Sequence, residues 1–201
     1  MFFMKIFLLS LFAIAFFSNT KNSDKIESNL DFDLERFNNE VSAIIPCINS
    51  NASYNNKVAF FIDMKIKSGK NRFFVYDLVN KKIIDQGLVA NGSGSETGIR
   101  GDLKFSNIVN SNSTSLGRYA IGKNYNGIFG KAYKLYGLDQ TNSNAFVRNI
   151  VLHQYSAVPS EEQDYYIVNS HGCPMINEQF FKRIEKIIDS SKTKIIMSIY
   201  Y

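Results

Sequence analysis

The chain has 201 residues, of which 45% are hydrophobic and 20% are charged. These proportions are typical of one globular domain and exclude a disordered or collagen-like chain. Only two cysteines are present, which excludes a disulfide-dense miniprotein. The net charge of +5 is spread along the chain without a basic cluster. Because nucleic-acid binding usually needs a concentrated basic patch, no nucleic-acid partner is expected.

An export signal is predicted at the N-terminus. Lys5 precedes an apolar run from 6 to 17 that is interrupted only by Ser10. A positive residue before an apolar run too short to span a bilayer comfortably is typical of a signal peptide. The alternative is a buried helix, but a polar stretch follows at once. We therefore assign 1–20 to a signal peptide or N-terminal anchor. We expect the protein to be exported to the periplasm or cell envelope, with membrane contact only through this segment if it is uncleaved.

A helix is predicted over 29–45, where apolar side chains recur every three or four positions. These positions are Leu30, Leu34, Phe37, Val41, Ile44 and Ile45. Pro46 should end the helix, because proline cannot donate a helical hydrogen bond. We assign 21–56 to a helical N-terminal segment that caps the rest of the chain or docks on it.

Strands are predicted over most of the remaining chain, which we assign to one domain, 57–201. Runs rich in β-branched and aromatic residues predict these strands at 58–63, 72–77, 83–90, 117–122, 149–153 and 193–200. The first three would form an antiparallel meander. Residues 91–118, rich in Gly, Ser, Asn and Thr, predict a long surface loop. A helix is predicted over 178–189, with Asn177 as its N-cap. The expected fold class is therefore mainly β with flanking α-helices.

The residues suited to chemistry cluster late in the chain. His153 ends an apolar stretch, and sixteen residues separate it from the block 170–173, Ser-His-Gly-Cys. A thiol becomes a good nucleophile when a nearby imidazole takes its proton and a second group orients that imidazole. We therefore expect His153 to lie close enough to Cys173 to keep the thiol ionised and aimed into an open groove.

Gly172 has a separate role in this hypothesis. Without a Cβ it permits a tight backbone path, so its N–H and that of Cys173 could face a developing oxyanion. The alternatives are core histidines with a buried thiol, a disulfide between Cys47 and Cys173, or a metal site. A zinc site would use His153, His171, Cys173 and Cys47, but their spacing matches no finger pattern and contains no Cys-x2-Cys pair.

The block 170–173 resembles the active-site motif of the L,D-transpeptidases of the YkuD fold, in which a first histidine precedes such a block at similar spacing. Further segments resemble the branch described as the murein L,D-transpeptidase catalytic domain. They are 105–107, 115–119, 127–130, 135–139 and 144–153, together with Pro174. The resemblance covers roughly residues 57–180.

The resemblance implies a β-sandwich-like catalytic fold that needs no cofactor. Cys173 would attack the L-to-D peptide bond of a peptidoglycan tetrapeptide stem and release the terminal D-Ala. His153 would be the general base and later the acid, oriented by the backbone carbonyl of Gln154. His171, Gly172 and the Cys173 N–H would shape the oxyanion region. The thioacyl enzyme would pass its acyl group to an amine of a neighbouring stem, giving a 3–3 crosslink, or to water.

The remaining site candidates would contact the substrate. They are Ser170, Gln154, Tyr155, Arg148 and Tyr125, with Tyr119 as a further residue that could line the cleft. Packing in the core or on the surface is the alternative for the aromatic residues and the arginine. Because the chemistry requires a reduced thiol, we expect Cys173 to be free and Cys47 to be structural. The competing functions are an exported cysteine hydrolase acting on another amide and a non-catalytic peptidoglycan-binding module.

Overall fold

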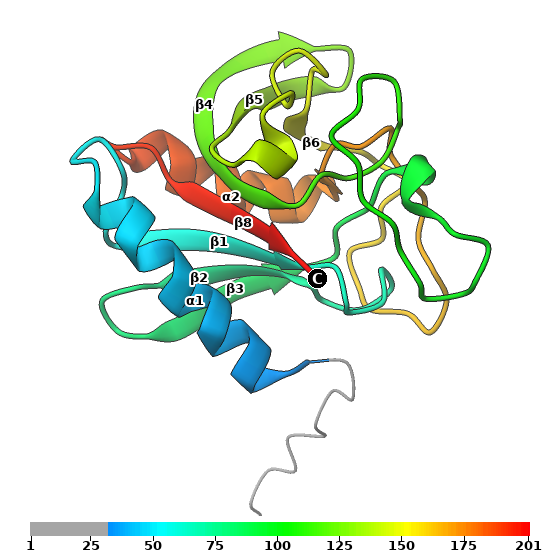
Figure 1. The fold of residues 1–201 in the computed structure, drawn as a ribbon, viewed down its shortest axis with the longest axis horizontal. Helices are drawn as coiled ribbons and strands as arrows, with labels where there is room; N and C mark the ends of the chain where they lie inside the picture. Colours follow the sequence, from blue (N-terminus) through cyan, green and yellow to red (C-terminus); the bar gives the residue numbers. More distant parts are fainter. Residues whose placement is uncertain (1–31) are drawn as a thin grey trace, which may run out of the picture.

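The computed structural model describes residues 32–201, so the predicted signal peptide lies outside the described residues. Its centre is one eight-stranded mixed sheet with the order β3-β2-β1-β8-β4-β5-β6-β7 (Figure 1). The strands are β1 (Val58–Asp63), β2 (Phe73–Asp77), β3 (Lys82–Gly87), β4 (Gly117–Gly127), β5 (Gly130–Gly137), β6 (Val151–Gln154), β7 (Met175–Ile176) and β8 (Ile196–Tyr200). The helices are α1 (Leu34–Asn49), α2 (Glu178–Ser190) and the short 3-10 turns η1 (Ser93–Ser95) and η2 (Gln140–Asn142). The predicted mainly-β class with flanking helices is confirmed.

Helix α1 covers one face of the first half of the sheet. Its apolar stripe, Phe37, Ile44 and Ile48, packs against β1, β2 and β8. Strand β1 is buried on both faces: Phe61 points to the α1 side, whereas Phe60 points to the opposite core. A strand that is buried on both faces needs a continuous apolar run, which explains the sequence of β1.

The prediction that Pro46 ends the first helix is wrong, because α1 continues to Asn49. Pro46 lies in the last turn, where its missing N–H removes only one hydrogen bond. The extra residues bring Ile48 into the core, where it is 4% exposed. Burial of this side chain offsets the lost bond.

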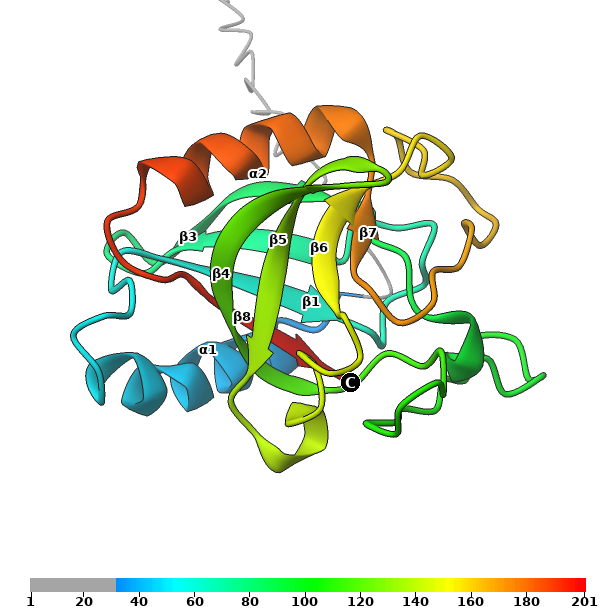
Figure 2. The same cartoon turned by 90° about the horizontal axis from the view of Figure 1, so that it is seen from above.

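Helix α2 closes the second core, around which the sheet curls (Figure 2). The predicted N-cap is confirmed, since the side chain of Asn177 accepts a hydrogen bond from the Phe180 N–H at 2.8 Å. Phe180, Phe181 and Ile184 are buried among side chains from both ends of the sheet. Strand β4 supplies part of the curvature, because its register with β5 shifts between Ile121 and Asn124.

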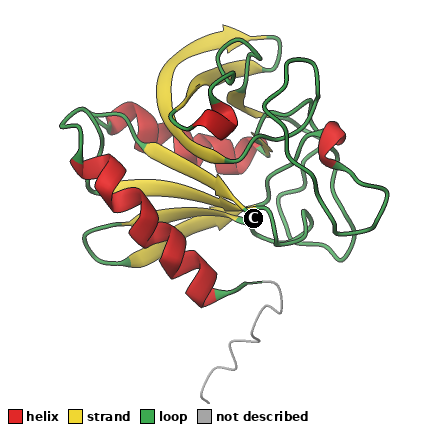
Figure 3. Cartoon of the chain, viewed as in Figure 1, coloured by secondary structure: helices red, strands yellow, loops and turns green. Residues whose placement is uncertain are grey.

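The long loops gather at one end of the molecule (Figure 3). The predicted loop 91–118 is largely confirmed, with η1 inside it and β4 starting at Gly117. It lies against the segment that carries the Ser-His-Gly-Cys block, since the Ser93 N–H donates to the Ser170 carbonyl at 2.8 Å. Strand β5 and the short β7 were not predicted. Within residues 32–201, neither helix has the length and apolar character needed to cross a membrane.

Candidate active site

The central site residues come together on one face of β5, β6 and β7. Pairing of these strands places Ala132, His153 and Met175 in one row across the sheet. Because side chains alternate between the two faces of a strand, Val151 shares the face of His153. Cys173 lies two residues before Met175, beside Val151.

His153 is buried and held in one orientation. Its Nδ1 lies 2.9 Å from the carbonyl oxygen of Gln154, so a proton on Nδ1 leaves Nε2 as the acceptor. The ring of Phe129 stacks on the imidazole, with 5.2 Å between ring centroids. Burial lowers the pKa of His153 below its ordinary value, against the opposing effect of the Gln154 carbonyl. The imidazole is therefore a neutral base near neutral pH.

The Cys173 thiol is bound by main-chain groups of the segment entering β6. The Val151 N–H donates to Sγ at 3.5 Å, and the thiol donates to the Asn149 carbonyl at 3.7 Å. Burial raises the pKa of Cys173, although the Val151 N–H and the charge of Arg148 act in the opposite direction. No hydrogen bond joins His153 to Cys173 among residues 32–201. The predicted pairing of His153 with the thiol is therefore not formed in this state, and burial favours the neutral thiol.

Both cysteines are free and partly exposed, so the alternative disulfide between Cys47 and Cys173 is not formed. The alternative zinc site is not assembled either. Within the part of the chain that the structure describes, no three His, Cys, Asp or Glu side chains lie together as metal ligands would. His171 is exposed and does not approach the thiol as a hydrogen-bond partner within that same part.

The block 170–173 forms a tight turn closed by the hydroxyl of Ser170. This hydroxyl accepts from the Gly172 N–H at 3.1 Å and donates to the Cys173 carbonyl at 2.6 Å. Gly172 has a φ of +112°, and a Cβ at this position would come within 2.8 Å of the Ser113 carbonyl. Glycine is therefore required for conformation and for space.

The turn also changes the expected roles of these residues. The Gly172 N–H is already used inside the turn, contrary to the expectation that it faces an oxyanion. The Cys173 N–H has no partner among residues 32–201 and is the donor that remains for this role. Ser170 holds the turn, so its hydroxyl is occupied rather than directed at a substrate.

Arg148 does not line a groove but binds the long loop that packs against the turn at 170–173. Its guanidinium donates to oxygens of the long loop, at 2.8 Å to the Ser106 carbonyl and 2.5 Å to the Ser113 carbonyl. The same Ser113 carbonyl lies against Gly172. Tyr119 does not line a cleft either, because it is fully buried and its hydroxyl donates to the Ser115 carbonyl at 2.7 Å. Both residues fix the loop against the turn at 170–173.

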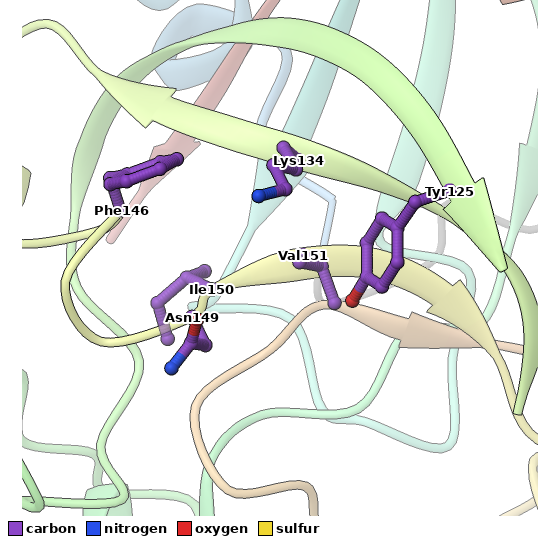
Figure 4. A pocket seen from close by; sticks show the side chains of 6 residues that line it. All are labelled: Tyr125, Lys134, Phe146, Asn149, Ile150 and Val151. Carbon is purple, nitrogen blue, oxygen red and sulfur yellow. The ribbon is translucent and has the colours of Figure 1, made fainter. Parts of the chain in front are cut away.

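Two cavities of about 220 Å³ each lie along β6. One is lined by residues that precede His153 in the chain, and the other mostly by residues that follow it. The first is lined by Tyr125, Lys134, Phe146, Asn149, Ile150 and Val151 (Figure 4). The second is lined by Phe129, Gln154, Tyr155, Ser156 and Glu178. Of the predicted substrate-binding residues, Tyr125 therefore borders one cavity, and Gln154 and Tyr155 border the other. We call the first of these the Lys134 cavity.

Sequence reasoning missed Arg72, which is 1% exposed. Its guanidinium donates to the Val89 carbonyl, to the Ile66 carbonyl and to Asn91 Oδ1. The backbone carbonyl of Asn91 in turn accepts from the Ser170 N–H at 2.8 Å. Burial lowers the pKa of Arg72 to about 10. The only signal in the sequence is an arginine that opens a strongly apolar strand, and that pattern does not identify its partners.

The chain belongs to the L,D-transpeptidase catalytic domain family, whose model matches residues 28–200. The sequence resemblance to this family is thereby confirmed. The matched region includes α1, and the predicted domain boundary at residue 57 stays a prediction.

The comparison with solved structures found several L,D-transpeptidases. One from Mycobacterium smegmatis is 11% identical, with a TM-score of 0.43 over 72% of this chain and 59% of that one. One from Enterococcus faecium is 9% identical, with a TM-score of 0.44 over 72% of this chain and 50% of that one. The helical cell shape determining protein from Campylobacter jejuni is 13% identical, with a TM-score of 0.46 over 72% and 48%. The chain thus spans about half of these proteins. A comparison with curated proteins found no match.

Proposed function

We propose that the protein is an exported cysteine acyltransferase that acts on peptidoglycan stem peptides through a thioacyl intermediate on Cys173. One observation carries the proposal: the thiol contacts Val151 and Asn149, two residues that line a cavity, on the same face of the sheet as an imidazole whose Nδ1 is fixed. Family membership indicates the substrate class. No metal or organic cofactor enters the proposed reaction.

The neutral state of both groups defines the first step. As the scissile carbonyl enters, Cys173 Sγ turns away from the Asn149 carbonyl, a rotation about χ1 between staggered positions. His153 Nε2 takes the thiol proton while Sγ bonds to the carbonyl carbon. The carbonyl oxygen becomes an oxyanion and accepts from the Cys173 N–H. A proton thus leaves the thiol only when a substrate is present.

The second step releases the leaving residue. The tetrahedral intermediate collapses, the C–N bond breaks, and the imidazolium of His153 returns its proton to the departing amine of D-Ala. The acyl group remains on Cys173 as a thioester. An amine of a neighbouring stem then attacks it, giving a 3–3 crosslink, or water attacks and leaves a trimmed tripeptide. His153 takes the proton of the attacking group in either case.

Digestion of purified sacculi followed by muropeptide analysis tests the reaction. We expect release of D-Ala together with 3–3 dimers or tripeptides, and no product from Cys173→Ala. Cys47→Ala is the matched control and should retain activity, because Cys47 lies on α1. Cleavage of a different amide would indicate a hydrolase instead, and sacculus binding without any product would indicate a binding module.

Covalent labelling tests the nucleophile separately. Incubation with a carbapenem should add the mass of the ring-opened drug to the protein and to Cys47→Ala, but not to Cys173→Ala. An adduct that persists in Cys173→Ala would assign the acyl transfer to another residue.

Export is proposed from the N-terminal apolar run alone. Cell fractionation of the full chain should recover the protein in the periplasm or cell envelope. Replacement of the run 6–17 by polar residues should retain it in the cytoplasm. Recovery of the unaltered chain in the cytoplasm would refute this part of the proposal.

A further inference from the structure

We propose that Lys134 binds a carboxylate of the acyl-donor stem in the Lys134 cavity, beside the nucleophilic thiol. This inference rests on the proposed function, because it assigns a substrate group to the same site. It adds a specificity-determining residue that neither the motif nor the family description names.

The cavity has the shape of a subsite for one small group. Its volume of about 220 Å³ is below the range of roughly 300–1,000 Å³ that is usual for whole small-molecule ligands. Figure 4 shows Lys134 between Phe146 and Tyr125 on one side, with Asn149, Ile150 and Val151 on the other. The ammonium nitrogen lies 4.9 Å from the centroid of the Phe146 ring and 5.8 Å from that of Tyr125. The two rings confine the cation without neutralising it.

Lys134 differs in this respect from the lysine three residues before it. Lys131 is paired with Asp189 and Glu185 on the far side of β5. Lys134 has no carboxylate within ion-pair distance among residues 32–201. A partly buried ammonium that lies over two aromatic rings and near no carboxylate is available to pair with an anion that a ligand brings.

Two residues that line the cavity also contact the sulfur of Cys173. Lys134 and Val151 are direct partners in the β5–β6 register, a geometry that places their Cβ atoms about 5 Å apart. Val151 and Asn149 line the cavity, and the N–H of the first and the carbonyl of the second contact Sγ. A substrate whose carbonyl reaches Sγ therefore brings its nearest substituents to Lys134.

The donor stem carries carboxylates at the required separation. The terminal carboxyl carbon of the leaving residue is three bonds from the attacked carbonyl carbon, which places it within about 4 Å. A third residue with an acidic side chain would offer a second carboxylate on the acyl side. Both groups are carboxylates next to the scissile bond. The second experiment below distinguishes the leaving residue from the third residue as their source.

The first experiment needs no turnover. Iodoacetate and iodoacetamide each form an S–C bond at Sγ and release iodide, but only iodoacetate is an anion. Peptide mapping follows the alkylation of Cys173. The rate with iodoacetate divided by the rate with iodoacetamide should fall about 5- to 10-fold at low salt in Lys134→Met. Lys134→Arg should restore it. Taking the ratio removes any effect of the lysine on the thiol itself. An unchanged ratio in Lys134→Met overturns the proposal.

Lys123→Met is the matched control. Lys123 is an exposed lysine of the neighbouring strand β4 and does not line the cavity. Its removal lowers the net charge of the protein by the same amount, and the rate ratio should stay close to that of the unaltered protein. An equal fall in both variants would show a general charge effect and also overturn the proposal.

The second experiment measures kcat/KM on stem peptides. Lys134→Met should lose roughly 10- to 100-fold on the tetrapeptide with a free terminal carboxylate. If the loss disappears on the terminal amide, the leaving residue supplies the carboxylate. If it disappears only when the side-chain carboxyl of the third residue is amidated, that residue supplies it. A loss of equal size on all substrates, or no loss, overturns the proposal.

The two proposals fail in different ways. If no stem is cleaved but the alkylation ratio still depends on Lys134, the proposed function fails and the anion subsite stands. If stems are cleaved by Lys134→Met as fast as by the unaltered protein, the subsite fails and the function stands.

Discussion

The two ends of the sheet are held together by different forces. Strands β1, β2 and β8 lie between two apolar cores, with α1 on one face and the α2 core on the other. At the opposite end, hydrogen bonds fix the turn that carries Cys173. Ser170 bonds within the turn, and Arg72 and Arg148 bond to segments that contact it. Apolar packing therefore stabilises the fold, whereas polar contacts position the site. Substitutions at the two ends should affect stability and chemistry differently.

Phe61→Ala should produce the largest loss of stability. Phe61 is fully buried in the first end of the sheet, with its ring 5.2 Å from that of Phe37. The expected cost is about 3–5 kcal/mol in the free energy of unfolding, measured by urea denaturation. Ile84→Ala, at an exposed position of β3, should change it by less than about 0.5 kcal/mol. Alkylation of Cys173 per folded molecule should be unaffected, and a slower rate would contradict the separation of the two ends.

Arg72→Met should affect both properties. It leaves three buried oxygen atoms without their donor, and we expect a loss of about 3 kcal/mol in the free energy of unfolding. Because Asn91 is the link to Ser170, stem cleavage should also fall. Arg72→Lys keeps the charge but not the planar guanidinium. It should recover only part of the stability and only part of the stem cleavage. Full activity in a folded Arg72→Met protein would show that this network does not position the turn.

Gly172→Ala and Gly98→Ala form a matched pair. Both glycines have positive φ, but a Cβ at Gly98 would meet no atom within 4 Å. Gly98→Ala should cost about 1 kcal/mol from backbone strain alone. Gly172→Ala should cost about 1–3 kcal/mol and should also abolish the carbapenem adduct, because the turn must move. Equal behaviour of the two variants in the labelling assay would contradict the tight packing of the turn.

The pH dependence is the smallest expected effect. Since the pKa of His153 is held below its ordinary value of 6.5, the base form persists at lower pH, and turnover should decline only below about 6.5. Since the pKa of Cys173 is raised above 9.0, alkylation of the folded protein should rise at a higher pH than that of the urea-unfolded chain. An alkylation midpoint below 9.0 in the folded protein would contradict the raised pKa of the thiol.

Local signals in the sequence predicted the elements that depend on local interactions. Helix α2 follows from Asn177 and an apolar period, and β1 follows from a continuous apolar run. Strand β5 was missed because Lys131 and Lys134 interrupt its apolar pattern. The structure explains both lysines, one by an ion pair with Asp189 and the other by its position at the cavity.

The candidate site, like the fold, was predicted only where the signal is local in the sequence. The predicted contact between His153 Nδ1 and the Gln154 carbonyl is observed, whereas the catalytic roles of His153 and Cys173 stay predictions. Arg72 and Asn149 were missed because their partners are distant in the sequence or belong to the main chain. The resting state of the thiol was also missed, since the pKa depends on burial, and burial is a property of the folded chain.

The bonds from Arg148 to the loop 106–115 determine where the chain can tolerate insertions. Ser113 contacts both Arg148 and Gly172, so one added residue near it would displace the sulfur without altering any member of the Ser-His-Gly-Cys block. The exposed stretch around Gly98 has no such connection, and relatives of different loop length should carry their extra residues there.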